Sequence, residues 1–120
     1  MLDHIGIPVS DCGRSKEFFK LALAPLGYQA IMEFEDAVGF GRDGKPDFWI
    51  GENKARASTH VAFSASKRRT VDDFYKAAIA AGGRDNGAPG LRPQYHPNYY
   101  GAFVLDPDGN NIEAVCHERE

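Results

Sequence analysis

The sequence has few cysteines, no long apolar run and no excess of charge of one sign. Cys12 and Cys116 are its two cysteines, too few for a disulfide framework and suited to a reducing cytoplasm. No apolar stretch could span a bilayer, and no charged-then-apolar leader is present. A net charge of −3 gives no reason to expect nucleic acid or an anionic membrane as partner. These absences favour a cytoplasmic protein that binds neither.

What is present is an ordinary globular composition, 42% hydrophobic and 26% charged, in 120 residues. This length predicts one domain, residues 1–120, which can bury roughly two-thirds of the surface of its unfolded chain. The chain is therefore long enough to build a hydrophobic core.

The strongest signal is an internal repeat. "HIGIPVSDCGRSKEFFKLALAPLG" (4–27) matches "HVAFSASKRRTVDDFYKAAIAAGG" (60–83) without gaps at an offset of 56. Asp-Gly pairs at 43–44 and 108–109 match at an offset of 65, which places an insertion of nine residues around "NGAPGLRPQYHP". The domain is predicted to contain two modules, about 1–55 and 57–120, that pack against each other.

Each module has the pattern strand, helix, strand, strand, strand. "LDHIGIPV" alternates apolar and small residues with period two, whereas "RSKEFFKLALAPLG" has helical spacing and ends at proline and glycine. In the second copy Thr70 and Asp73 form a predicted capping box, and "RDNGAPG" (84–90) is the least strand-like segment. The predicted fold class is α+β, with two βαβββ modules.

The first residue of each copy is a histidine on the less bulky face of its strand. His4 shares that face with Gly6, and His60 shares it with Ala62 and Ser64, which leaves space beside each imidazole. Glu113 lies within an otherwise apolar final strand, where a carboxylate needs a charged or metal partner. Two imidazoles and one carboxylate suit a divalent metal with open positions. A hydrogen-bonded core histidine is the alternative.

Three segments resemble the vicinal oxygen chelate superfamily, which includes glyoxalase I, extradiol dioxygenases, fosfomycin-resistance thiol transferases and bleomycin-resistance proteins. They are "LDHIGIPVSDCGRSKEFF", "THVAFSA" and "GAFVLDPDGNNIEAV". The resemblance implies an open half-barrel in which His4, His60 and Glu113 hold one divalent ion, zinc, manganese, iron or nickel. Phe48 is opposite Glu113 at the 65-residue offset, so no fourth protein ligand is expected.

The enlarged loop of the second module is rich in polar aromatic residues. His96 matches the histidine of the extradiol signature, although Ala102-Phe103 replaces the aliphatic-Tyr pair. His96 is therefore a candidate acid–base residue. Arg92, Tyr99 and Tyr100 are candidates for substrate binding at the mouth of the cup. Trp49 is a further candidate, with packing as its simpler role.

The resemblance implies a metal-dependent lyase, isomerase or dioxygenase that chelates neighbouring oxygens of a small substrate and stabilises an oxyanion. The alternative is a non-catalytic binder of the bleomycin-resistance type. A homodimer is expected because the edge strands of an open cup otherwise stay exposed. The modules of one site come either from one chain or from two. Substrate, reaction and the use of a thiol cosubstrate are left open.

Overall fold

We describe the protein from a computed structural model, in which residues 3–54 and 58–120 are described. The predicted module boundary at 55–57 lies outside these residues. The elements, in chain order, are β1 (Ile5–Val9), α1 (Cys12–Ala22), the short 3₁₀ helix η1 (Ala24–Leu26), β2 (Gln29–Glu33), β3 (Ala37–Arg42), β4 (Lys45–Glu52), β5 (His60–Ser64), α2 (Arg68–Ala80), β6 (Arg84–Leu91), β7 (Tyr100–Leu105) and β8 (Asn111–Cys116).

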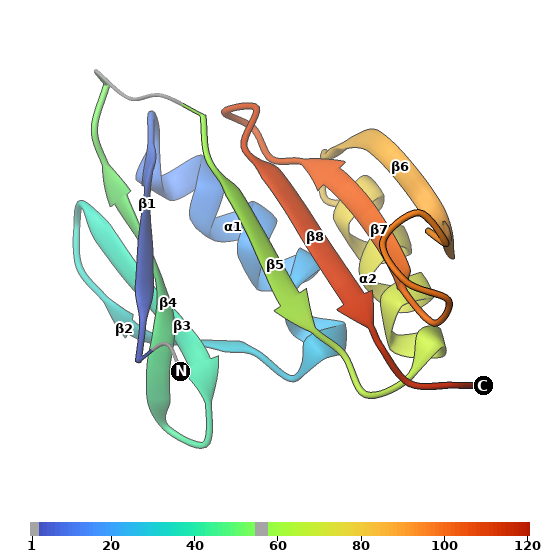
Figure 1. Cartoon of the computed structure of the whole chain (residues 1–120). Coiled ribbons are helices and arrows are strands. Elements are labelled where there is room, and N and C mark those ends of the chain that lie inside the picture. The colour runs from blue at the N-terminus through green and yellow to red at the C-terminus, as the bar shows by residue number, and fades with distance from the viewer. Residues whose placement is uncertain (1–2, 55–57) are drawn as a thin grey trace.

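The elements form two equivalent four-stranded sheets. Their strand orders are β1-β4-β3-β2 and β5-β8-β7-β6, with the first pair parallel and the other pairs antiparallel. The predicted α+β fold of two βαβββ modules is thereby confirmed. Figure 1 shows the sheets beside each other, with β1 and β5 as neighbouring edge strands that run in opposite directions. Neither helix of the described residues is long and apolar enough to cross a membrane.

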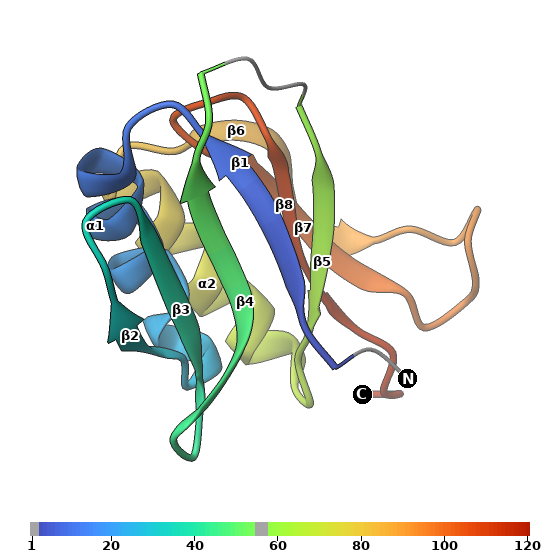
Figure 2. The ribbon, with the colours of Figure 1, turned by 90° about the vertical axis from the view of Figure 1, so that its left-hand side faces the viewer.

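The helices cover one face of each sheet and leave the other face open (Figure 2). On β5, Val61 and Phe63 are buried on the helix side, whereas His60, Ala62 and Ser64 are exposed on the opposite side. Both modules share one core, because the Phe48 ring of the first module contacts the Phe63 ring of the second with centroids 5.0 Å apart. The expected division between an apolar face and a histidine face is therefore present.

The segment with the weakest strand signal is nevertheless a strand. Residues 84–91 form β6 at the edge of the second sheet. Proline is tolerated on an edge strand because no further strand on the outer side needs its missing N–H. Its pairing with β7 is irregular, and Gly87 adopts a φ of 150° at the interruption. A Cβ there would lie 3.0 Å from the Phe103 ring, so glycine permits this close approach.

The predicted capping box at Thr70 and Asp73 is wrong. Helix α2 begins at Arg68, and its N-cap residue Lys67 provides no side-chain cap. Instead the backbone N–H of Arg68 donates to Oε2 of Glu120 at 2.7 Å. A carboxylate from the far end of the chain thus satisfies a free amide at the helix start, an interaction that local sequence spacing cannot reveal.

The turn before β8 ties the two modules together. The backbone N–H of Ser10, just before α1, donates to Oδ2 of Asp108 at 2.8 Å, and the Ser10 hydroxyl donates to Oδ1. The Arg14 guanidinium lies 3.6 Å from the same carboxylate, whose side chain is only 2% exposed. Residues almost a hundred positions apart are therefore joined by a buried charge-assisted contact.

We expect Asp108→Asn to lower the free energy of unfolding by about 1–3 kcal/mol, because the amide leaves a buried donor facing the donors of Ser10. Urea denaturation measures this loss. Asp43→Asn is the matched control, since Asp43 occupies the equivalent turn of the first module and is exposed. Equal stability of the two variants would contradict the proposed link between the modules.

Candidate functional site

His60 and Glu113 meet on the open face of the second sheet. Strands β5 and β8 are parallel neighbours, and Ala62 pairs with Glu113, so the His60 side chain lies diagonally beside the carboxylate. His60 Nε2 is 3.1 Å from Glu113 Oε1. The His60 side chain is 50% exposed and that of Glu113 only 2%, so the carboxylate is reached from the imidazole side.

The orientation of the His60 ring identifies its free nitrogen. Nδ1 lies 2.9 Å from the carbonyl oxygen of Asn111, which can only accept, so Nδ1 carries the proton and donates. In the neutral ring Nε2 then presents a lone pair to the Glu113 carboxylate. Two acceptors at 3.1 Å need either a proton on one of the two atoms or a metal ion between them.

Tyr99 holds the other oxygen of Glu113. Its hydroxyl donates to Oε2, and Gly101 leaves the room for this contact, since a Cβ there would be 3.2 Å from both Oε2 and the Tyr99 ring. Burial, followed by the hydrogen bond to Glu113, raises the pKa of Tyr99 to about 12. The phenol therefore stays protonated at neutral pH and is a steady donor.

His96 and His117 form a second pair next to Tyr99. The backbone N–H of Asn98 donates to His96 Nδ1 at 3.0 Å, so the neutral ring carries its proton on Nε2. That N–H donates to His117 Nδ1 at 2.7 Å. Both imidazoles contact the Tyr99 ring, with centroids 5.5 and 5.2 Å away. Both nitrogens of the predicted acid–base residue are thus engaged.

His4 stands apart from this group. It is on the first module, exposed, with its Nδ1 2.9 Å from Asp3 Oδ2. β1 and β5 run in opposite directions (Figure 1), and His4 directly precedes β1 whereas His60 begins β5, so the two histidines lie towards opposite ends of these strands, although both border one cavity between the modules. Within residues 3–54 and 58–120 no three His, Cys, Asp or Glu side chains are grouped closely enough to hold a metal. One chain therefore brings together two of the three predicted ligands.

A cavity of about 470 Å³ lies over the carboxylate. Its lining comprises His60, Tyr95, Tyr99, Phe103, Asn111 and Glu113. Three aromatic side chains and the His60 imidazole thus surround one buried carboxylate. Sequence reasoning did not single out Phe103 or Asn111. Strand alternation carries the signal, because Asn111 precedes Glu113 by two residues and Phe103 follows Gly101 by two.

The other predicted substrate-binding residues lie elsewhere. Tyr100 is on the helix-covered face of β7, and its hydroxyl donates to Asp72 Oδ1 at 2.6 Å, so it is outside the cavity. The Arg92 guanidinium lies over the Phe103 ring, 5.4 Å from its centroid, and donates to the Ala88 carbonyl. Trp49 is on the open face of the first sheet against Phe34.

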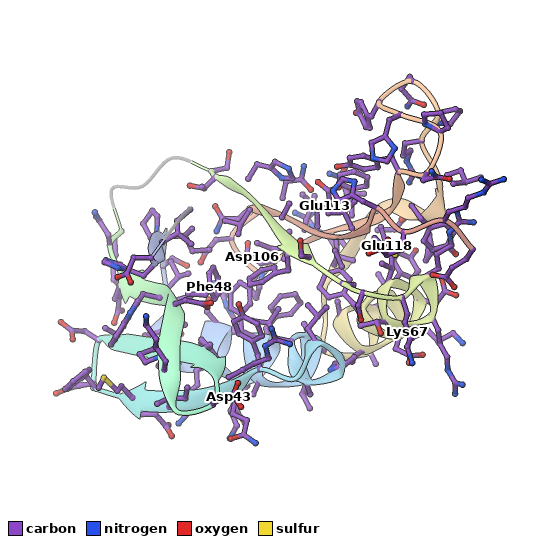
Figure 3. The ribbon with its side chains drawn as sticks, turned by 60° about the horizontal axis from the view of Figure 1, so that its bottom comes forward. Asp43, Phe48, Lys67, Asp106, Glu113 and Glu118 are labelled. Carbon is purple, nitrogen blue, oxygen red and sulfur yellow. The ribbon has the colours of Figure 1, made fainter. Side chains whose placement is uncertain are left out.

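The expected pairing of Phe48 with Glu113 is wrong by one residue. Ile5 pairs with Phe48 and Gly6 with Trp49, whereas Val61 pairs with Ile112 and Ala62 with Glu113. The structural counterpart of Glu113 is therefore Trp49, and Phe48 is buried in the core. Figure 3 labels Phe48 and Glu113 on their separate modules. Tryptophan is no metal ligand, so this register likewise gives no reason to expect a fourth protein ligand.

A family model matches residues 1–114 of the chain. The chain belongs to the Glyoxalase/Bleomycin resistance protein/Dioxygenase superfamily. This membership confirms the resemblance read from the "DPDGNNIE" segment and its partners. The superfamily includes enzymes, and the paired modules described above have the arrangement of its solved members.

Several proteins are similar over nearly the whole chain. A glyoxalase/bleomycin resistance protein from Albidiferax ferrireducens is 28% identical, with 97% of this chain and 98% of that chain covered and a TM-score of 0.82. The protein YqjT of Bacillus subtilis is 27% identical over 130 aligned positions, covering 96% and 98% of the two chains. A lactoylglutathione lyase from Agrobacterium tumefaciens, 14% identical with a TM-score of 0.71 and coverage of 96% and 92%, shares the fold.

We expect Tyr99→Phe to destabilise the metal-free protein by about 1–3 kcal/mol, because it leaves one oxygen of the buried Glu113 carboxylate without a donor. Urea denaturation in the presence of a chelator measures the effect. Tyr95→Phe is the matched control, since Tyr95 is 62% exposed. If Tyr99→Phe is no less stable than Tyr95→Phe, the contact with Glu113 does not hold the carboxylate.

Proposed function

We propose that the protein is a divalent-metal-dependent enzyme whose site is shared between two copies of the chain. His60 and Glu113 of one copy and His4 of a second copy would be the ligands. The observation that carries this proposal is the facing of His60 Nε2 and Glu113 Oε1 at 3.1 Å, with the remaining imidazole N–H donated to a backbone carbonyl. Histidine ligands commonly donate their second N–H in this way.

The residues present fit a divalent ion. Nε2 of His60 and Oε1 of Glu113 both carry lone pairs and lie 3.1 Å apart, so both atoms would hold one ion. The Tyr99 hydroxyl donates to Oε2, which leaves Oε1 as the oxygen that would be the ligand. Imidazole and carboxylate ligands suit zinc, manganese, iron and nickel. Three protein ligands leave positions open for a substrate.

A second copy accounts for the separation of His4 from the other two ligands. The open face of the first sheet carries apolar side chains without cover, with Met32 46% and Phe34 61% exposed. β1 and β5 each have an edge without a hydrogen-bonded neighbour among the described strands. If this face of one copy covered the open face of the second sheet in its partner, a two-fold axis would generate two equal sites.

A bound ion would supply Lewis-acid stabilisation of an oxyanion on a substrate that offers two neighbouring oxygens. The chain's own residues hold and surround that substrate. Tyr95, Tyr99 and Phe103 form apolar walls that exclude water and orient the substrate. His96 is our proposed proton-transfer residue. His117 is exposed and hydrogen-bonded to His96, so it can exchange protons with solvent.

We expect the purified wild-type protein to bind one divalent ion per chain, and His60→Ala and Glu113→Gln each to weaken binding by about 100-fold or more, since each removes a ligand. Isothermal titration with zinc, manganese and nickel, together with metal analysis, measures this. His117→Ala is the matched histidine control and should retain the ion. Equal metal content in wild type and His60→Ala would overturn the proposal.

Mixing two inactive variants tests whether the site is shared. A dimer of one His4→Ala chain and one His60→Ala chain contains one intact ligand set if the ligands come from different copies. After equal mixing and exchange, about a quarter of the sites should regain the affinity of the wild type, whereas neither variant alone binds well. No recovery in a mixture that has exchanged subunits would show that all ligands come from one chain.

A second candidate is a non-catalytic binder of a planar small molecule, favoured by the aromatic walls of the cavity and by the exposed Tyr95 ring. For a binder, affinity for an aromatic ligand is the same with and without a chelator. For the proposed enzyme, ligand affinity falls when the ion is removed. Titration of an aromatic ligand with and without a chelator therefore separates the binder from the enzyme.

A further inference from the structure

A second cavity lies at the seam between the modules, away from Glu113. It has a volume of about 360 Å³, and residues of β1, β4 and β5 contribute to its lining. Its apolar lining includes Leu26, Phe48 and Phe63, and its polar lining includes Tyr28, Arg42 and Asp47. Of the site residues above, His4 borders this cavity and His60 borders both, whereas Glu113, Tyr99 and Phe103 line only the other. The volume is within the range of small-molecule pockets.

A β-bulge brings Asp47 to this cavity. In the pairing of β3 with β4, Phe40 faces Phe48 and Gly41 faces Pro46, so Asp47 has no partner. The equivalent pairing of β7 with β8 is continuous. The extra residue is thus specific to the first module. Bulges re-aim side chains and are frequent beside functional sites, which makes this one a candidate binding feature.

The Asp47 carboxylate is incompletely satisfied. Its Oδ1 is buried and has no hydrogen-bond partner among the described residues. Burial, followed by the interaction with Asp47, raises the pKa of Tyr28 to about 12. The Tyr28 phenol beside this carboxyl group therefore stays protonated at neutral pH. The χ2 torsion of aspartate has a broad energy minimum, so the Asp47 carboxylate can rotate about it. Such a rotation would bring the unpaired oxygen to a donor in the cavity.

Arg42 supplies an uncompensated positive charge at the same cavity. It ends β3, and within residues 3–54 and 58–120 its guanidinium forms no ion pair. Asp3, the other acid in the lining, is already engaged by His4 at 2.9 Å and by Lys45 at 3.5 Å. The cavity thus presents one available anion and one available cation above an aromatic floor.

We propose that the seam cavity binds an α-amino acid with an apolar side chain. Its ammonium group would donate to Asp47, its carboxylate would accept from Arg42, and its side chain would pack against Phe48 and Phe63. A zwitterion satisfies both charges at once, whereas a simple amine or a simple acid satisfies one and meets the other unfavourably. Neither Asp47 nor Arg42 is a ligand of the metal site proposed above, although His4 and His60 border this cavity as well.

Isothermal titration of the full chain tests this with L-phenylalanine, and with two analogues that each lack one charge, 2-phenylethylamine and 3-phenylpropanoate. We expect L-phenylalanine to bind saturably, and both analogues to bind at least about tenfold more weakly than L-phenylalanine. No saturable binding of L-phenylalanine, or binding of an analogue as tight as that of the amino acid, would overturn the proposal.

Two variants assign the charged groups. Arg42→Gln should weaken the binding of L-phenylalanine by about tenfold without weakening the binding of 2-phenylethylamine. Asp47→Asn should weaken the binding of L-phenylalanine equally without weakening the binding of 3-phenylpropanoate. Arg84→Gln and Asp43→Asn are matched controls outside the cavity, and circular dichroism checks folding. Removal of divalent ions with a chelator should leave these affinities unchanged, which separates this result from the metal site. Unchanged affinity in both cavity variants would refute the assignment.

Discussion

The whole arrangement depends on a single hydrophobic core shared by the two modules. Phe48 of the first sheet contacts Phe63 of the second, and both helices pack into the same space. At Gly83, just after α2, a Cβ would lie 2.4 Å from Val104 and 2.9 Å from Phe18, so the chain segments approach as closely as backbone allows. Because this core takes one face of each sheet, the opposite faces stay open.

Polar groups on the open face owe their geometry to that constraint. Glu113 belongs to a strand whose neighbouring residues Ile112 and Ala114 are anchored in the core, so its carboxylate is held on the other face beside His60. The loop between β6 and β7, which projects from the molecule in Figure 2, returns Tyr99 to this carboxylate. A carboxylate on an open sheet face becomes almost completely buried in this way, which increases the need for a cationic partner.

The two modules have the same fold but different chemistry at equivalent positions. Trp49 stands where Glu113 stands in the second module, and the bulge at Asp47 has no counterpart there. The first module thus offers an aromatic surface and a seam cavity, whereas the second offers a carboxylate and an imidazole. Duplication supplied the scaffold, and a single extra residue in β4 was enough to shift which side chains face outwards.

The sequence by itself determined the duplicated βαβββ architecture, the division of each first strand into an apolar and a histidine face, and the placement of Glu113 on the face of its strand opposite Ile112 and Ala114. These follow from local periodicity and from repeat spacing, which are properties of the chain. Only the tertiary structure decided that Trp49 rather than Phe48 matches Glu113, that Tyr100 faces Asp72, and that His4 lies apart from His60 within one chain. A bulge changes the register by one residue without a sequence signal, and distances between modules depend on how their shared core packs.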